Sequence, residues 1–145
     1  MTFSPNKVIM REQRSQKNRG CKSFNIIRFK FGDSALIVGQ QCNFETRYFH
    51  FVKNFFKKIS KKIMGYRYNF RRKCWIPIFP NFPLTKKSKN SRMGKGKGFF
   101  VRWIVRLQAG NKILETKHLS SYRLACLRCF LQKHLGIKIL LFSSK

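Results

Sequence analysis

The chain has 145 residues, 43% of them hydrophobic and 15% aromatic, and its 33 Lys and Arg against four acids leave a net charge of +29. This composition excludes a disordered cationic tail, and the chain is long enough to bury roughly 70% of the surface that it exposes when unfolded. Four scattered acids provide no paired carboxylates for catalysis, so we predict that the protein is not an enzyme. The large positive charge indicates an anionic partner, and nucleic acid is the first candidate.

Residues 1–22 are polar and basic without apolar periodicity, which predicts an N-terminal arm that becomes ordered only against a partner. The segment lacks the apolar core of a secretory signal. A mitochondrial presequence is the alternative on composition, and we favour an arm that stays on the protein. Residues 23–145 then form a single domain.

Two elements are predicted at the start of this domain. Apolar and polar residues alternate over 24–31, which predicts a strand that Gly32 ends. Between Asn43 and Ile63 apolar residues recur every three or four positions, the strongest helix pattern in the chain, with Asn43 as the expected N-cap. Lysines crowd the last turns of this helix, where the helix dipole favours cations.

Residues 65–73 form a basic connector in which cations alternate with Tyr66, Tyr68 and Phe70. Such a mixture can stack on unpaired bases while Arg71 and Arg72 contact phosphates. The alternative is that these rings cover the end of the preceding helix.

A short strand is predicted from Cys74 to Phe79, where apolar residues alternate again. Pro77 cannot donate a hydrogen bond to a neighbouring strand, which places this strand at a sheet edge. Pro80 and Pro83 are expected to close it.

Residues 85–98 form a long loop with six cations and no acid. Glycines at 94, 96 and 98 let the backbone approach a ligand closely, and Lys95 and Lys97 supply charge between them, a combination suited to phosphate. The spacing is not that of an ATP-binding phosphate loop, because neither Gly-Lys pair precedes Ser or Thr. A solvated linker is the alternative. If all six cations met phosphates, the loop alone would contribute a slope of about −4 to −5 in log affinity against log salt.

The remaining chain predicts two strands, a helix and a last strand. The strand 101–107 is followed by a turn at 109–111 and by a partner strand that carries Ile113 and Glu115, which together read as a hairpin. A helix is expected from about Ser121 until Gly136 stops it, with Leu124, Leu127, Leu131 and Leu135 on one face. Residues 137–142 then return as a strand. The predicted fold class is α+β, an antiparallel sheet with two helices packed on one face, a long basic loop and a basic arm.

Metal and membrane functions have little support in the sequence. Cys126, Cys129 and His134 have the spacing that begins a zinc knuckle, but the fourth ligand would fall at Ile139, and both cysteines lie within a helical pattern. We therefore expect no metal and no cofactor. Every apolar run is interrupted by charge, so no membrane span is expected. A surface-binding cationic helix is a further alternative.

Two segments carry a specific resemblance. The chain reads Trp75-Ile76-Pro77-Ile78-Phe79-Pro80-Asn81-Phe82-Pro83-Leu84-Thr85-Lys86-Lys87, then Arg92-Met93-Gly94-Lys95-Gly96-Lys97-Gly98. In this order and spacing they resemble the universal large-subunit ribosomal protein sixteen family, called L-sixteen in bacteria. The likeness continues through Trp103 and the segments 108–110, 113–115 and 135–138, and upstream through 18–20, so it covers about residues 18 to 142.

The resemblance implies an α+β sandwich that binds large-subunit ribosomal RNA and neighbouring ribosomal proteins, takes no small-molecule substrate, and directs its loop toward the aminoacyl-tRNA and the peptidyl-transferase region. An extraribosomal RNA chaperone or single-strand binder is the alternative function. The abundance of Phe, Lys, Asn and Ile is typical of an AT-rich genome and favours a mitochondrial ribosome. The expected RNA-binding residues are Arg19, Arg71, Arg72, Lys86, Lys87, Lys89, Arg92, Met93, Gly94, Lys95, Gly96, Lys97 and Gly98.

Overall fold

The computed structural model describes residues 28–64, 70–92, 94 and 96–144, with the side chains of 56–71 left out. The predicted arm and the aromatic rings of the basic connector therefore lie outside the described part. Two long helices, α1 (Thr46–Met64) and α3 (Ser121–Leu135), accompany a short helix α2 (Phe70–Lys73) and two antiparallel sheets. The α+β prediction is confirmed.

The four-stranded sheet is built around β1 (Ser34–Val38), in which all five residues are buried. Its strand order is β3-β6-β1-β7, where β3 is Cys74–Trp75, β6 is Lys112–Thr116 and β7 is Ile139–Ser143. Strand β1 was not predicted, because a strand covered on both faces shows an unbroken apolar run instead of alternation. The predicted last strand is confirmed as β7.

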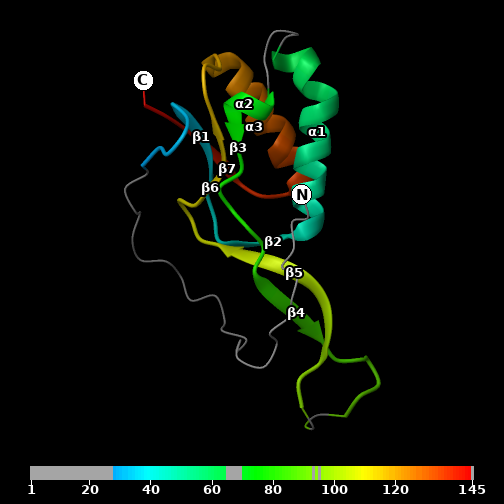
Figure 1. Ribbon diagram of the computed structural model, residues 1–145. Helices are drawn as coiled ribbons and strands as arrows, with labels where there is room; N and C mark the ends of the chain where they lie inside the picture. The colour runs from blue at the N-terminus through cyan, green and yellow to red at the C-terminus, as the bar shows by residue number, and fades with distance from the viewer. Residues whose placement is uncertain (1–27, 65–69, 93, 95, 145) are drawn as a thin grey trace.

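Helices α1 and α3 pack side by side on one side of this sheet (Figure 1). Leu124, Leu127, Leu131 and Leu135 form the buried stripe of α3, at the spacing that the sequence predicted. The rings of Phe55 on α1 and Phe130 on α3 stack with centroids 4.0 Å apart and join the helices. Gly136 ends α3 in the left-handed conformation, with φ 63°, and its N–H donates to Gln132 O at 3.0 Å.

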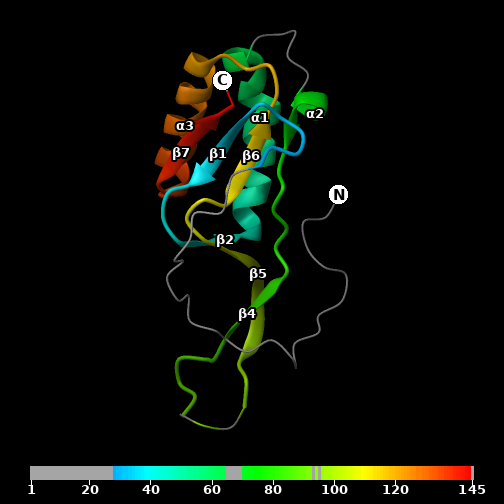
Figure 2. The same cartoon turned by 90° about the vertical axis from the view of Figure 1, so that its left-hand side faces the viewer.

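The three-stranded sheet has the order β2-β5-β4, with β2 at Cys42–Glu45, β4 at Phe82–Lys86 and β5 at Phe99–Leu107. Near its C-terminal end β5 pairs with β2, for example Leu107 with Cys42, and toward its start it pairs with β4. Figures 1 and 2 show that β4 and the first part of β5 extend away from the helices and the four-stranded sheet. We call β4, the start of β5 and the loop between them the ribbon, and the rest of the described fold the body.

The predicted hairpin between 101–107 and the strand with Ile113 is wrong. The turn is present, with Asn111 N–H donating to Gln108 O at 3.1 Å, but β5 belongs to the three-stranded sheet and β6 to the four-stranded one. At the turn, the backbone N–H of Gly110 and Val38 O form a 2.8 Å hydrogen bond instead. The chain thus passes from one sheet to the other where local turn chemistry indicated a return.

The predicted strand over 24–31 is also wrong for the residues that are described. Residues 28–33 form no strand and instead lie against the four-stranded sheet, where Phe29 stacks on Phe142 and Phe31 stacks on Trp75. The backbone N–H groups of Lys30 and Phe31 donate to the Glu115 carboxylate at 3.3 and 3.0 Å. This carboxylate takes the hydrogen bonds that a neighbouring strand would otherwise take.

Glu115 is fully buried on β6 and forms an ion pair with Lys112. The Lys112 ammonium also donates to Arg28 O at 2.6 Å. Burial raises the pKa of Glu115. The hydrogen bonds from Lys112, Phe31 and Lys30 and the charge of Lys112 lower the pKa by more than burial raises it, so the net shift is downward. An ionised carboxylate in the body therefore holds residues 28–31 in place.

Three boundaries differ from prediction. Asn43 lies in β2 and is not the N-cap of α1, which begins at Thr46; the Thr46 hydroxyl donates to Trp103 O at 2.8 Å. The strand predicted over 74–79 is only the two residues of β3. Pro83, expected to close a strand, lies inside β4 opposite Trp103, where β4 is an edge strand and tolerates proline.

Candidate nucleic-acid interface

The basic loop lies at the far end of the ribbon, where β4 and β5 stop pairing (Figure 1). The last pair is Lys86 with Phe99. A Cβ at Gly98 would come within 2.5 Å of the Lys86 carbonyl carbon, so only glycine allows this close approach of the two chains. Between the two strands lies the segment predicted as a loop, and the first two residues of the predicted range, Thr85 and Lys86, belong to β4.

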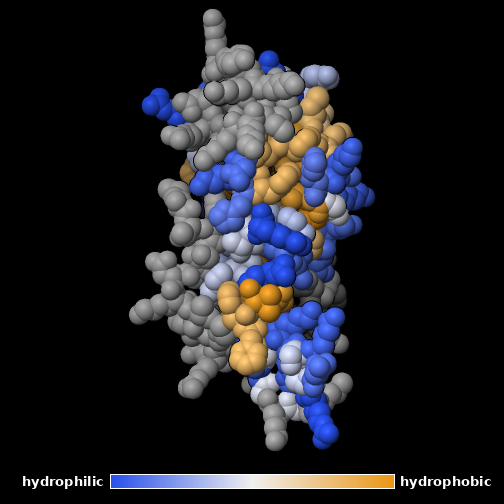
Figure 3. All heavy atoms as spheres, turned by 90° about the vertical axis from the view of Figure 1, so that its right-hand side faces the viewer, coloured by the Kyte–Doolittle hydropathy of each residue, from blue (hydrophilic) through white to orange (hydrophobic). Residues whose placement is uncertain are grey.

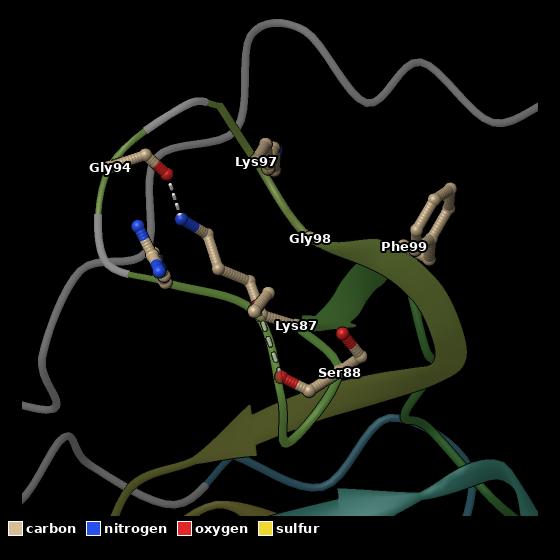
Figure 4. A pocket seen from close by; sticks show the side chains of 8 residues that line it. Lys87, Ser88, Gly94, Lys97, Gly98 and Phe99 are labelled. Carbon is tan, nitrogen blue, oxygen red and sulfur yellow. Dashed lines mark hydrogen bonds between the residues drawn. The ribbon is translucent and has the colours of Figure 1, made fainter.

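Hydrogen bonds within the loop give it a defined shape. The Lys87 ammonium reaches across the loop and donates to Gly94 O, as Figure 4 shows. Ser91 donates to Ser88 O through both its backbone N–H (3.2 Å) and its hydroxyl (3.0 Å). Gly94 and Gly96 have φ values of 103° and 89°, which L side chains rarely adopt. These bonds and dihedral angles favour a loop with a defined conformation over a solvated linker.

The loop concentrates positive charge at its surface. Its described cations, Lys86, Lys87, Lys89, Arg92 and Lys97, are all exposed. Each acid that the structure describes lies in the body. Glu45 pairs with Arg47 and Arg102 at 2.6 Å, Glu115 pairs with Lys112, and Asp33 accepts from the backbone N–H of His118 at 3.2 Å. The described carboxylates are thus engaged in the body, whereas the described cations of the loop are exposed.

A hollow of about 530 Å³ opens between the two sides of the loop. Its walls combine cationic side chains, serine hydroxyls and glycine backbone with one aromatic ring, Phe99, which is 85% exposed. Figure 3 shows the hydrophilic loop at the lower end of the molecule with a small hydrophobic area directly above it. The lining residues are Lys87, Ser88, Ser91, Arg92, Gly94, Lys97, Gly98 and Phe99.

Three of these lining residues were not predicted from the sequence. Ser88 and Ser91 were read only as loop residues, and Phe99 was not assigned a role. A signal for Phe99 was available, because the pair Phe99-Phe100 precedes a strand that otherwise alternates, so one of the two rings must face away from the core.

Side-chain contacts fix the ribbon to the body. Arg102 on β5 pairs with Glu45 at the end of β2, and the Arg106 guanidinium lies 4.0 Å from the ring centre of Phe82 on β4. Because these contacts join all three strands of the smaller sheet, the loop is held at a defined distance from the helices.

Among the described residues, one other predicted RNA-binding residue is not brought to the loop. Arg72 is exposed on α2, which lies at the opposite end of the molecule (Figure 1). The Arg71 side chain, Arg19, Met93 and Lys95 lie outside the described residues. The structure thus brings together Lys86, Lys87, Lys89, Arg92, Gly94 and the segment 96–98, and leaves Arg72 apart from them.

The residues considered for metal binding lie on α3. His134 packs against the rings of Phe130 and Phe51, with centroid distances of 4.2 and 5.4 Å. Within the described ranges, no group of three or more His, Cys, Asp and Glu side chains is placed to hold a metal ion. Nor does any helix in the described part have the length and apolar character needed to cross a membrane.

Comparison with known proteins matches nearly the whole chain. The family described as Ribosomal protein L16p/L10e matches residues 5–134. The large ribosomal subunit protein uL16 of Sulfurovum sp. (strain NBC37-1) is 33% identical over 111 residues, covering 77% of this chain and 72% of the relative. The protein of the same name from Thioalkalivibrio sulfidiphilus (strain HL-EbGR7) is 30% identical over 118 residues, covering 81% and 80%. This chain therefore belongs to the L16p/L10e family of ribosomal proteins.

Proposed function

We propose that this protein is a structural constituent of the large ribosomal subunit that binds ribosomal RNA through the loop of the ribbon. Two bacterial relatives carry the name large ribosomal subunit protein uL16, which supports the assignment to that subunit. The observation that carries RNA binding is the exposed cationic loop, from which every described acid is distant in the fold. A structural role fits this site, because the loop offers positive charge and a defined backbone shape.

The ribbon supports a finer proposal about where the loop acts. The loop extends beyond the body, so it can enter RNA while the body stays at the subunit surface (Figure 2). We place it beside the aminoacyl-tRNA, where it helps to shape the surroundings of the peptidyl-transferase site. The RNA performs the chemistry there, and the protein supplies phosphate contacts and a fixed backbone. Neighbouring ribosomal proteins and the arm over 1–22 complete the proposed contacts.

The test begins with sedimentation of ribosomes from cells that express the tagged full chain. The protein should appear in the large-subunit peak at one copy per particle. Absence from that peak, or an amount far below one copy, contradicts the proposal and favours an RNA chaperone instead.

A pair of matched variants then tests the loop. The double variant Lys89→Gln/Arg92→Gln removes two exposed loop cations, and Lys133→Gln/Lys138→Gln removes two exposed cations of the body. The loop variant should lower occupancy in the large subunit at raised salt, because each lost phosphate contact weakens binding. Equal loss in both variants would mean that the loop has no special share in binding.

We further propose that the ribosome in question is mitochondrial and that the gene lies in the organelle. The support is composition: 16 Phe in 145 residues, with abundant Lys, Asn and Ile, is typical of AT-rich coding sequence. Fractionation of the source cells with an antibody to the chain tests this. Recovery with cytosolic ribosomes would contradict it.

A further inference from the structure

Phe99 is an exposed aromatic ring at the base of the basic loop. Its side chain is 85% exposed, more than that of Phe31, Phe79, Phe142 or Tyr122. Neighbouring Val101 is 44% exposed, so an apolar area continues along β5. An aromatic ring that a fold leaves in water loses the stabilisation that burial would give it, and such rings are a common means of binding planar ligands.

The backbone under this ring is fixed. Phe99 pairs with Lys86 across the ribbon, and the chain just before it makes the close approach at Gly98. Figure 4 shows the ring standing clear of the start of β5, next to Gly98 and beyond Lys97. A ligand that stacks on Phe99 therefore meets a ring whose backbone needs no reordering, which lowers the entropy cost of binding.

Phe99 shares its hollow with cations. Lys87, Arg92 and Lys97 line the same space of about 530 Å³, and no acid among the described residues lines it. The lining thus combines one planar apolar surface with several positive charges along the loop. A nucleotide has the complementary parts, because its base is planar and apolar on both faces and its phosphate is anionic.

We propose that Phe99 is a stacking platform for an unpaired base of RNA, with the loop cations holding the phosphates on either side. The inference rests on the proposed function and names the ligand of the same loop as a single-stranded nucleotide instead of a duplex backbone. A paired base keeps its faces covered by its neighbours in the helix, so only an unpaired one can lie against the ring. An acidic protein segment could meet the cations but has no planar group for the ring.

The test measures binding of the purified full chain to two probes, a single-stranded oligoribonucleotide and its abasic counterpart, which has the same phosphates and no bases. Phe99→Ala should weaken binding to the first probe by about 5- to 100-fold and leave binding to the second unchanged. Phe99→Trp should restore binding. Tyr122→Ala, which removes a ring that is 78% exposed on α3, is the matched control and should change neither affinity.

Arg92→Gln separates this inference from the proposed function. It should weaken binding to both probes equally, because it removes a phosphate contact. The slope of log affinity against log salt should also fall by about 0.7. If Phe99→Ala affects both probes equally, or neither, the stacking inference is overturned while an effect of Arg92→Gln keeps the charged-loop function. If the unaltered chain binds neither probe at low salt, both are overturned.

Assembled particles identify the source of the base. Unpaired bases of the RNA are probed chemically in particles that carry Phe99 or Phe99→Ala, with and without tRNA. A ribosomal base that becomes reactive in the variant supports the inference and assigns the ligand to ribosomal RNA. A base of tRNA that becomes reactive supports it and assigns the ligand to tRNA. No change at any base under either condition overturns it.

Discussion

The body and the ribbon differ in where they place apolar and charged side chains. The body buries its apolar side chains, including Leu36, Leu114 and Leu131 at 0% exposure, and engages the acids that the structure describes in ion pairs or hydrogen bonds. The ribbon ends in exposed cations, glycines with positive φ and an exposed ring. The body is stable through its own contacts, whereas in the proposed function the loop is completed by RNA. Substitutions should therefore separate the two regions, with effects on folding in one and on binding in the other.

The largest effect on folding is expected at Glu115. Glu115→Ala leaves the Lys112 ammonium without its buried partner and frees the N–H groups of Lys30 and Phe31. The free energy of unfolding, measured with urea at neutral pH, should fall by about 3–5 kcal/mol. Glu45→Ala breaks ion pairs whose arginines are 65% and 42% exposed, and should cost no more than about 1 kcal/mol. Similar losses would contradict the contrast.

The effect of Glu115 should also depend on pH. Its pKa is lowered on folding, so its contribution to stability is complete above the range in which an unfolded glutamate titrates, and it is lost as the pH falls through the lower, folded pKa. The difference between the unaltered chain and Glu115→Ala should therefore shrink in acid. Urea titrations over a pH series test this, and a difference that grows in acid would reverse the sign that we assign.

The next largest effect is expected in the core. Leu131→Ala removes a side chain with 0% exposure from the middle of α3 and should lower the free energy of unfolding by about 2–5 kcal/mol. Phe99→Ala deletes a larger side chain in the ribbon and should change it by no more than about 0.5 kcal/mol. Thermal unfolding of both variants compares them directly. A large loss at Phe99 would show that the ring packs against the fold.

A smaller and local effect is expected at the glycines of the loop. Gly98→Ala forces a Cβ against the backbone of Lys86 and should destabilise the pairing of β4 with β5 by about 1–3 kcal/mol. Gly94→Ala meets no atom within 4 Å but must hold φ 103°, at a cost of about 1–2 kcal/mol within the loop. Hydrogen exchange should show faster opening of both strands in Gly98→Ala only, with the amides of β1 and β6 unchanged.

The smallest effect on folding is expected from the loop cations. Lys86→Gln/Lys89→Gln replaces two exposed side chains and should leave the free energy of unfolding within about 0.5 kcal/mol. The slope of log affinity for single-stranded RNA against log salt should still fall by about 0.7 for each cation. A change in stability without a change in slope would place these lysines in the fold and not in the interface.

Local sequence signals predicted the elements whose stabilising contacts are local. The leucine spacing and Gly136 predicted α3 with its end, and the glycines and lysines predicted the loop. Pairing between distant strands was not accessible in this way. Phe44 fits the helical spacing of the residues after it, yet it lies in β2, where it pairs with Val105 of β5. The turn at Gly110 predicted a reversal but could not predict that the next strand joins another sheet.

The role of Pro83 and that of Phe99 also depend on strand pairing that local sequence does not reveal. Pro83 was read as the end of a strand, although an edge strand tolerates it and β4 contains it. The cations of the loop were predicted because charge is visible in sequence. The role of Phe99 depends on which face of β5 is covered, and that depends on the pairing of β4, β5 and β2, which no local pattern contains.

Strand β5 has a mechanical consequence. It is a single strand of nine residues, which spans about 30 Å. It pairs with β2 at one end and with the edge strand β4 at the other, where the register shifts by one residue between Arg102 and Phe100. Because β5 is paired with neighbouring strands on both sides, it holds the loop away from the body. The position of the loop is therefore determined by the length of the strand and not by the loop's own composition. The loop's sequence can therefore diverge while its reach stays constant, and shortening β5 by a pair of residues would withdraw an intact tip from its target.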